Sequence, residues 1–116
     1  MKKLNDRVSS LRHRIEIESP VLTPIGGGQY DLGWSNFATV WAAIEPAQSR
    51  IVNVEKLRDE QLETPVSHRI RLRFMEGITT KMRIVFGGRV FNIRSVINPD
   101  ERNEFLLLLA EEQVAI

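Results

Sequence analysis

The two histidines are the first candidates for chemistry, because an imidazole can bind a metal ion or act as a general base. His13 and His68 each occupy an inward-facing position of a predicted strand, so they would be neighbours if those strands paired. A zinc site needs a third and usually a fourth ligand, and the chain has no cysteine. We therefore interpret both residues as core or barrel-end histidines and predict no metal site.

Other catalytic signals are equally sparse. No serine lies in the sharp turn between a strand and a helix that presents a nucleophile. The acidic pairs Asp100/Glu101 and Glu111/Glu112 fall in a turn and near the C-terminus, where solvated carboxylates are expected. The sequence therefore predicts no catalytic residue and no cofactor, and we do not expect an enzyme.

A run of three glycines, Gly26, Gly27 and Gly28, invites comparison with a phosphate-binding loop. Such a loop follows a strand, opens a helix and carries a Gly-Lys-Ser/Thr sequence, none of which is predicted here. A flexible loop is the favoured interpretation. Tyr30 and Trp34 follow directly, and they either anchor a protein partner or fold back over the end of the barrel.

Arg69, Arg71 and Arg73 form a stripe on one face of a predicted strand, extended by Arg83. The stripe could face phosphates. Pairing with carboxylates, across strands or across a subunit interface, is the favoured alternative. Glu16 and Glu18 on the first strand are candidate partners, but an exposed pair contributes only about 0–1 kcal/mol.

The overall charge argues against a dedicated nucleic-acid binder. The formal net charge is +1, whereas such proteins usually carry a strong basic excess. A single-stranded nucleic-acid binder would also need aromatic residues among the basic ones on one face. Phe74 points away from the arginine stripe. A small nucleic-acid-binding barrel therefore remains an alternative of lower rank.

Alternating apolar and polar residues predict the strands that must position these side chains. The clearest segments are 11–18 and 66–74, followed by a hairpin of 81–86 and 89–97 that turns at Gly87-Gly88. Residues 37–44 and 105–109 are apolar on both faces. Either could form a helix, but β-branched or aromatic residues in the first and a short length in the second favour strands.

These elements predict an all-β protein, a small antiparallel β-barrel or sandwich in one domain spanning residues 1–116. Residues 19–36 are predicted to be a long loop after the first strand, because they contain Pro20, Pro24 and several glycines. Residues 50–63 predict either a short exposed helix or a solvated loop, and residues 1–10 a flexible N-terminal arm. We expect neither a secretory signal nor a membrane span, since the apolar runs are too short.

The order of several short motifs resembles the phage head–tail joining family, which includes head–tail adaptor and head-closure proteins. The motifs extend from about residue 11 to 109, and each alone is weak. They are Leu11-Arg12-His13-Arg14-Ile15, Trp41-Ala42-Ala43-Ile44-Glu45-Pro46, His68-Arg69-Ile70-Arg71-Leu72-Arg73-Phe74, Gly77-Ile78-Thr79-Thr80-Lys81-Met82-Arg83-Ile84, Gly88-Arg89-Val90-Phe91-Asn92-Ile93 and Asn98-Pro99-Asp100-Glu101-Arg102.

This resemblance implies a barrel subunit that assembles as a dodecameric ring, below the portal and its adaptor. The ring would retain packaged DNA, which passes through the channel without sequence-specific binding, and would dock the tail. The partners implied are portal or adaptor proteins and tail proteins. The protein would be part of the virion, after assembly in the host cytoplasm. The family's long loop reaches into the channel or towards a neighbour, a role that falls on 19–36 here. A tail terminator or tail-completion protein is the close alternative.

Overall fold

The computed structural model describes residues 11–47 and 66–113 of the chain. Six strands run in the order β1 (His13–Gly26), β2 (Gln29–Pro46), β3 (His68–Arg73), β4 (Arg83–Phe86), β5 (Arg89–Ile97) and β6 (Phe105–Glu112). Within the described ranges, a three-residue 3-10 turn at Pro99–Glu101 is the one helical element. No helix in this part of the chain is long and apolar enough to cross a membrane.

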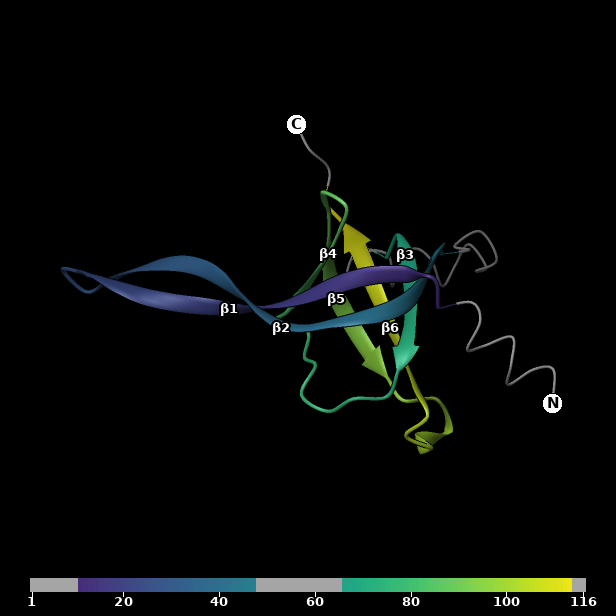
Figure 1. Cartoon of the computed structure of the whole chain (residues 1–116). Helices are drawn as coiled ribbons and strands as arrows, with labels where there is room; N and C mark the ends of the chain where they lie inside the picture. The colour runs from purple at the N-terminus through teal and green to yellow at the C-terminus, as the bar shows by residue number, and fades with distance from the viewer. Residues whose placement is uncertain (1–10, 48–65, 114–116) are drawn as a thin grey trace, which may run out of the picture.

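The strands close into a barrel in the order β1-β2-β3-β6-β5-β4, and β4 pairs with β1 to complete the ring. All of the neighbouring strands are antiparallel. The prediction of a small antiparallel β-barrel is therefore confirmed. Figure 1 shows that the β1–β2 hairpin extends far beyond the barrel on one side.

Alternation along each strand sends one set of side chains into the barrel. Burying each large apolar side chain contributes about 1.5–3 kcal/mol, and this core joins strands from the whole length of the chain. The fully or almost fully buried large side chains are Ile15, Ile17, Ile70, Leu72, Ile84, Phe91, Ile93 and Leu108.

The hairpin predicted at 81–97 is confirmed as β4 and β5. Its turn residues Gly87 and Gly88 have φ angles of 53° and 85°, which side-chain-bearing residues rarely adopt. The two segments with ambiguous patterns are also strands: 37–44 lies in β2 and 105–109 in β6. Both are paired on two sides over part of their length. Phe37 and Trp41 nevertheless remain 38% and 51% exposed, so segment 37–44 is not covered on both faces.

The prediction of a long loop at residues 19–36 is wrong. These residues continue β1 and β2 as a two-stranded ribbon, in register from Glu18↔Asn36 to Gly26↔Gln29. Proline is compatible with an edge strand, where its missing N–H costs no ladder hydrogen bond. Among the described strands, β2 is the only neighbour of the part of β1 that contains Pro20 and Pro24, so these prolines do not break the pairing. The segments 1–10 and 50–63 lie outside the described residues.

Candidate functional site

The most distinctive surface is the projecting end of the β1–β2 hairpin, residues 19–36, which we call the arm (Figure 1). β1 pairs with β4 only as far as Glu18, and β2 pairs with β3 only from Ala42 onwards. Beyond these points, none of the other strands in the described residues lies beside the ribbon. At about 3.3 Å per residue, the arm extends about 26 Å from Glu18 to its tip.

The pairing register divides the arm into two unlike faces, because directly opposed residues on an antiparallel pair share a face. The opposed pairs on one face are Pro20↔Trp34, Leu22↔Leu32 and Pro24↔Tyr30. Those on the other face are Ser19↔Ser35, Val21↔Gly33 and Thr23↔Asp31. The first set is apolar or aromatic throughout, and we call it the apolar face of the arm.

Much of this apolar surface is open to solvent. Leu22 is 63% exposed, Leu32 56% and Tyr30 61%. Ile25, at the register shift near the tip, is also 61% exposed but belongs to neither set of opposed pairs. A two-stranded ribbon is marginally stable by itself, and a contiguous exposed apolar patch marks an interaction surface. The arm is therefore a candidate docking element.

Arg83 of β4 fixes the base of the arm. Its Nε donates a hydrogen bond of 2.8 Å to Glu18 Oε1, and its guanidinium lies 4.1 Å from the ring centroid of Trp34. The Arg83 and Glu18 side chains are only 23% and 20% exposed. Trp34 thus folds onto the barrel, whereas Tyr30 points to solvent at the far end. Of the two alternatives for these aromatics, folding back onto the barrel describes Trp34. A partner-anchoring role for Tyr30, which is 61% exposed, stays a prediction.

A second contact lies where the ribbon leaves the barrel. The register between Ile17 and Glu18 shifts by one residue, so that Phe37 is an extra, bulged residue of β2. A Cβ atom on Gly77 would lie 2.9 Å from Phe37 Cζ, and Gly77 has a φ of +98°. Glycine is therefore favoured at this position, where the ring of Phe37 lies close to the β3–β4 connection.

The glycine run forms the tip of the arm. Gly26, Gly27 and Gly28 have φ angles of 101°, 61° and 76°. Positive φ at Gly27 and Gly28 suits a tight two-residue hairpin turn. The turn is not a phosphate-binding loop of the strand–loop–helix type, because the strand β2 follows it instead of a helix.

The arginine stripe has a local partner on β2. Arg71 Nη1 lies 3.6 Å from Glu45 Oε2, as the alternative of cross-strand pairing anticipated. Glu18 pairs with Arg83 instead, because β4 and not β3 is the neighbour of β1. Arg69 lies opposite Leu109 of β6. Arg73 is exposed at the end of β3.

His13 and His68 do not lie on paired strands, because β2 separates β1 from β3. His13 contacts the edge of Phe86, and His68 that of Phe91, at centroid distances of 5.0 and 5.1 Å. In residues 11–47 and 66–113, no group of three or more His, Cys, Asp or Glu side chains could hold a metal ion.

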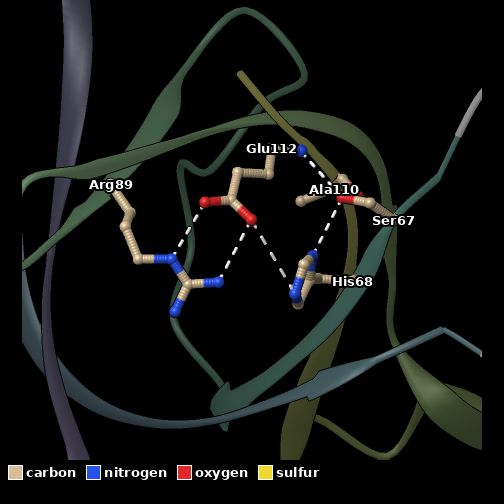
Figure 2. A network of polar contacts seen from close by, with 5 residues as sticks. All are labelled: Ser67, His68, Arg89, Ala110 and Glu112. Atoms are coloured by element: carbon tan, nitrogen blue, oxygen red, sulfur yellow. Dashed lines mark hydrogen bonds and ion pairs between the residues drawn. The ribbon is translucent and has the colours of Figure 1, made fainter. Parts of the chain in front are cut away.

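His68 belongs instead to a polar network that sequence reasoning missed (Figure 2). Its Nδ1 lies 2.9 Å from Ser67 Oγ, which accepts a 2.8 Å hydrogen bond from the Glu112 amide. Arg89 donates two hydrogen bonds to the Glu112 carboxylate, at 2.9 and 3.1 Å. These bonds lower the pKa of Glu112 and raise that of Arg89. The Ser67 hydroxyl is engaged by a backbone amide, so we interpret the network as a structural link between β3, β5 and β6.

An open groove of about 420 Å³ lies beside β2, at the end of β3, where no other strand of residues 11–47 and 66–113 pairs with β2 on that side. Apolar side chains form most of its wall, and Trp41 is 51% exposed there. Arg14 lies over the Trp41 ring at 5.1 Å from its centroid. The groove is lined by Leu11, Thr39, Val40, Trp41, Arg73, Phe74 and Met75.

Fold and surface together define a class of protein: a small closed barrel that presents an apolar hairpin and an apolar groove, as subunits of larger assemblies do. A family model described as phage head completion protein matches residues 7–113, and the chain belongs to this family. The sequence-based resemblance to head–tail joining proteins is thereby confirmed. The family gives the chain a structural role at the head–tail region of a virion.

Two solved structures share the fold. Protein SF1141 from Shigella flexneri 2a, determined in solution, superposes with a TM-score of 0.72 and 25% identity, covering 94% of this chain and 98% of that one. A chain from the virion of a native gene transfer agent particle gives a TM-score of 0.63 and 22% identity, covering 90% and 97%. At 22% identity, the match to the gene transfer agent chain shows a shared fold and no more. No curated protein matches the chain.

Proposed function

We propose that the chain is the head-closure subunit of its particle. Twelve copies would form a ring below the portal and adaptor, retain the packaged DNA and dock the tail. Family membership supports a position at the joint between head and tail. The single structural observation that carries the proposal is the arm, whose apolar face is exposed from Leu22 to Tyr30 and projects away from the barrel.

The charge distribution suits a DNA channel that allows movement. Phosphate contacts by Lys and Arg supply most non-specific DNA affinity. Asp31 is the single charged residue among residues 19–36. An arm that reaches the channel would therefore not bind the phosphates, and DNA would slide past without sequence-specific contacts. Partners on either side would be portal or adaptor proteins and tail proteins.

The test is electron microscopy of particles from the parental phage or prophage with this gene interrupted. DNA-empty or leaking heads lying apart from complete tails are expected. Full, DNA-retaining heads without tails would overturn head closure and assign the protein to the tail side, as a terminator or completion protein. Complete, infectious particles would overturn a joining role altogether.

Complementation then tests whether the arm carries the function. The Leu22→Ser/Leu32→Ser variant removes the centre of the apolar face without touching the barrel core and should fail to restore particles. The matched control, Thr23→Ser/Asp31→Asn, changes neighbouring exposed positions on the opposite face and should restore them. Equal complementation by both variants would contradict a docking role for the apolar face.

A further inference from the structure

We infer that the outer wall of the barrel, where β1, β2 and β3 lie side by side, binds an unpaired DNA strand without sequence preference. The contact places phosphates on Arg12, Arg14 and Arg73 and a base against Trp41. It is a property of the single subunit and does not depend on the proposed ring. Its basis is a row of basic and aromatic side chains that no single strand contains.

Three neighbouring strands assemble this row. Arg14, Trp41 and Arg73 each lie beside a fully buried core residue of their own strand, so alternation directs all three outwards. Arg14 is the register partner of Trp41. Arg73 follows Leu72, whose partner Ala42 follows Trp41. The tryptophan therefore stands between the two arginines, which are two strand spacings apart, about 10 Å.

Trp41 supplies the aromatic surface that the arginines of β3 lack on their own strand, where Phe74 packs against the core. Its side chain is 51% exposed and lines the groove beside β2 together with Arg73. The Arg14 guanidinium lies 5.1 Å from the ring centroid. Bases of any identity stack on an exposed aromatic ring, and arginine adds a cation–π contribution. Strand closure thus creates a combination typical of single-strand binding.

The charge of this wall suits phosphates. Arg12, Arg14 and Arg73 are exposed, and no carboxylate of residues 11–47 and 66–113 forms an ion pair with any of them. Residues 1–14 contain five basic residues and one acidic residue, whereas the whole chain has a net charge of +1. Positive charge is therefore concentrated in the sequence that leads into β1. Glu16, the next outward residue of β1, limits the basic surface, so we expect a weak contact that salt disrupts.

A single strand fits the row better than the alternatives. Each base of a strand is flanked by two phosphates, which matches one aromatic ring between two arginines. The bases of a duplex are stacked on one another and offer no free face to Trp41. Tryptophan and arginine are also common at protein interfaces, so an acidic protein surface is the competitor to be tested.

Fluorescence anisotropy of a labelled oligothymidylate with the purified full-length protein tests the contact. The log–log salt slope should have a magnitude of about 2 or more, because a single strand contributes about 0.7 per neutralised phosphate. Trp41→Leu should weaken binding about tenfold. Arg14→Gln/Arg73→Gln should weaken it too and reduce the slope by about 1.4. Circular dichroism verifies that each variant is folded.

Two matched controls remove the same groups elsewhere. Tyr30→Leu removes an aromatic ring from the arm, where it is 61% exposed. Arg94→Gln removes a charge from β5, which lies opposite β2 in the closed order of strands. Both variants should bind the strand as the natural chain does.

Three results would overturn the inference. The first is no binding at low salt, or equal binding by Trp41→Leu and the natural chain. The second is a duplex of the same length that binds as tightly as the strand, which would leave Trp41 without a role. The third is displacement of the strand by an equal charge of polyglutamate, which would assign the row to an acidic protein partner. None of these results bears on head closure, which particles without the gene test separately.

Discussion

Arg83 offers the sharpest test of how the arm is held. A double-mutant cycle with Arg83→Met and Glu18→Gln isolates their coupling free energy. Hydrogen bonds to charged groups contribute about 1.5–3 kcal/mol, and exposed ion pairs about 0.2–1 kcal/mol. The Arg83 and Glu18 side chains are 23% and 20% exposed, with a 2.8 Å hydrogen bond between them. We therefore expect a coupling of about 1–2 kcal/mol, between those two limits.

Arg83→Met alone should cost more than this coupling, because it also removes the contact with Trp34. A cation over an aromatic ring contributes about 0.5–1 kcal/mol at a partly exposed site. Urea unfolding gives the stability of each variant, and amide hydrogen exchange shows whether protection is lost first in residues 19–36. The loss of protection should be confined to the arm, since the barrel core lies elsewhere.

The chain contains its own control pair. Arg94 and Glu111 also form an ion pair across β5 and β6, but their side chains are 39% and 34% exposed. The corresponding cycle with Arg94→Met and Glu111→Gln should give less than about 1 kcal/mol and should weaken more in salt. Equal coupling in the two pairs, or unchanged protection of the arm in Arg83→Met, would refute the role of Arg83 in holding the base of the arm.

Three further predictions concern the barrel. Gly77→Ala should destabilise the fold by about 1–3 kcal/mol. The new side chain would sit at a φ of +98°, and its Cβ would lie 2.9 Å from Phe37 Cζ. An unchanged urea midpoint would contradict this prediction. Leu108→Ala empties a fully buried site and should cost about 2–5 kcal/mol in the same assay, whereas Leu22→Ala on the arm should cost far less. The third concerns pH, because the hydrogen bonds from Arg89 lower the pKa of Glu112 in the folded protein. The pair therefore stabilises the fold above the ordinary carboxyl pKa. This stabilisation is lost as the pH falls through the lowered pKa that Glu112 has in the folded state. Glu112→Gln should therefore be less stable than the natural chain at pH 7 and nearly equal to it in strong acid; a stability difference that persists there in thermal unfolding would sink the idea.

The barrel could be predicted because its signals are local. Strict alternation along 66–74 and the Gly87-Gly88 turn of 81–97 specify strands and a hairpin before any tertiary contact is known. The family resemblance lies in the same segments, since they carry the short motifs. The fold class therefore followed from residues whose preferences agree with their final environment.

The arm was misassigned because its preferences point the other way. Pro20, Pro24 and three consecutive glycines are typical of loops. Their effect is overridden by the long register of β1 on β2, in which the prolines occupy a strand with a free edge. Strand alternation was present in Tyr30, Leu32 and Trp34, but a two-faced ribbon becomes visible only when the partner positions are known.

The sequence by itself determined the all-β class, the main hairpin and the family, because alternation and turn residues act over a few neighbouring positions. The tertiary structure alone decided which charges and aromatics meet. Glu18 and Arg83, Trp34 and Arg83, and Ser67 and Glu112 are far apart in the chain and are brought together by barrel closure. Strand order sets these contacts, and no local preference of a residue encodes which strand will lie beside its own.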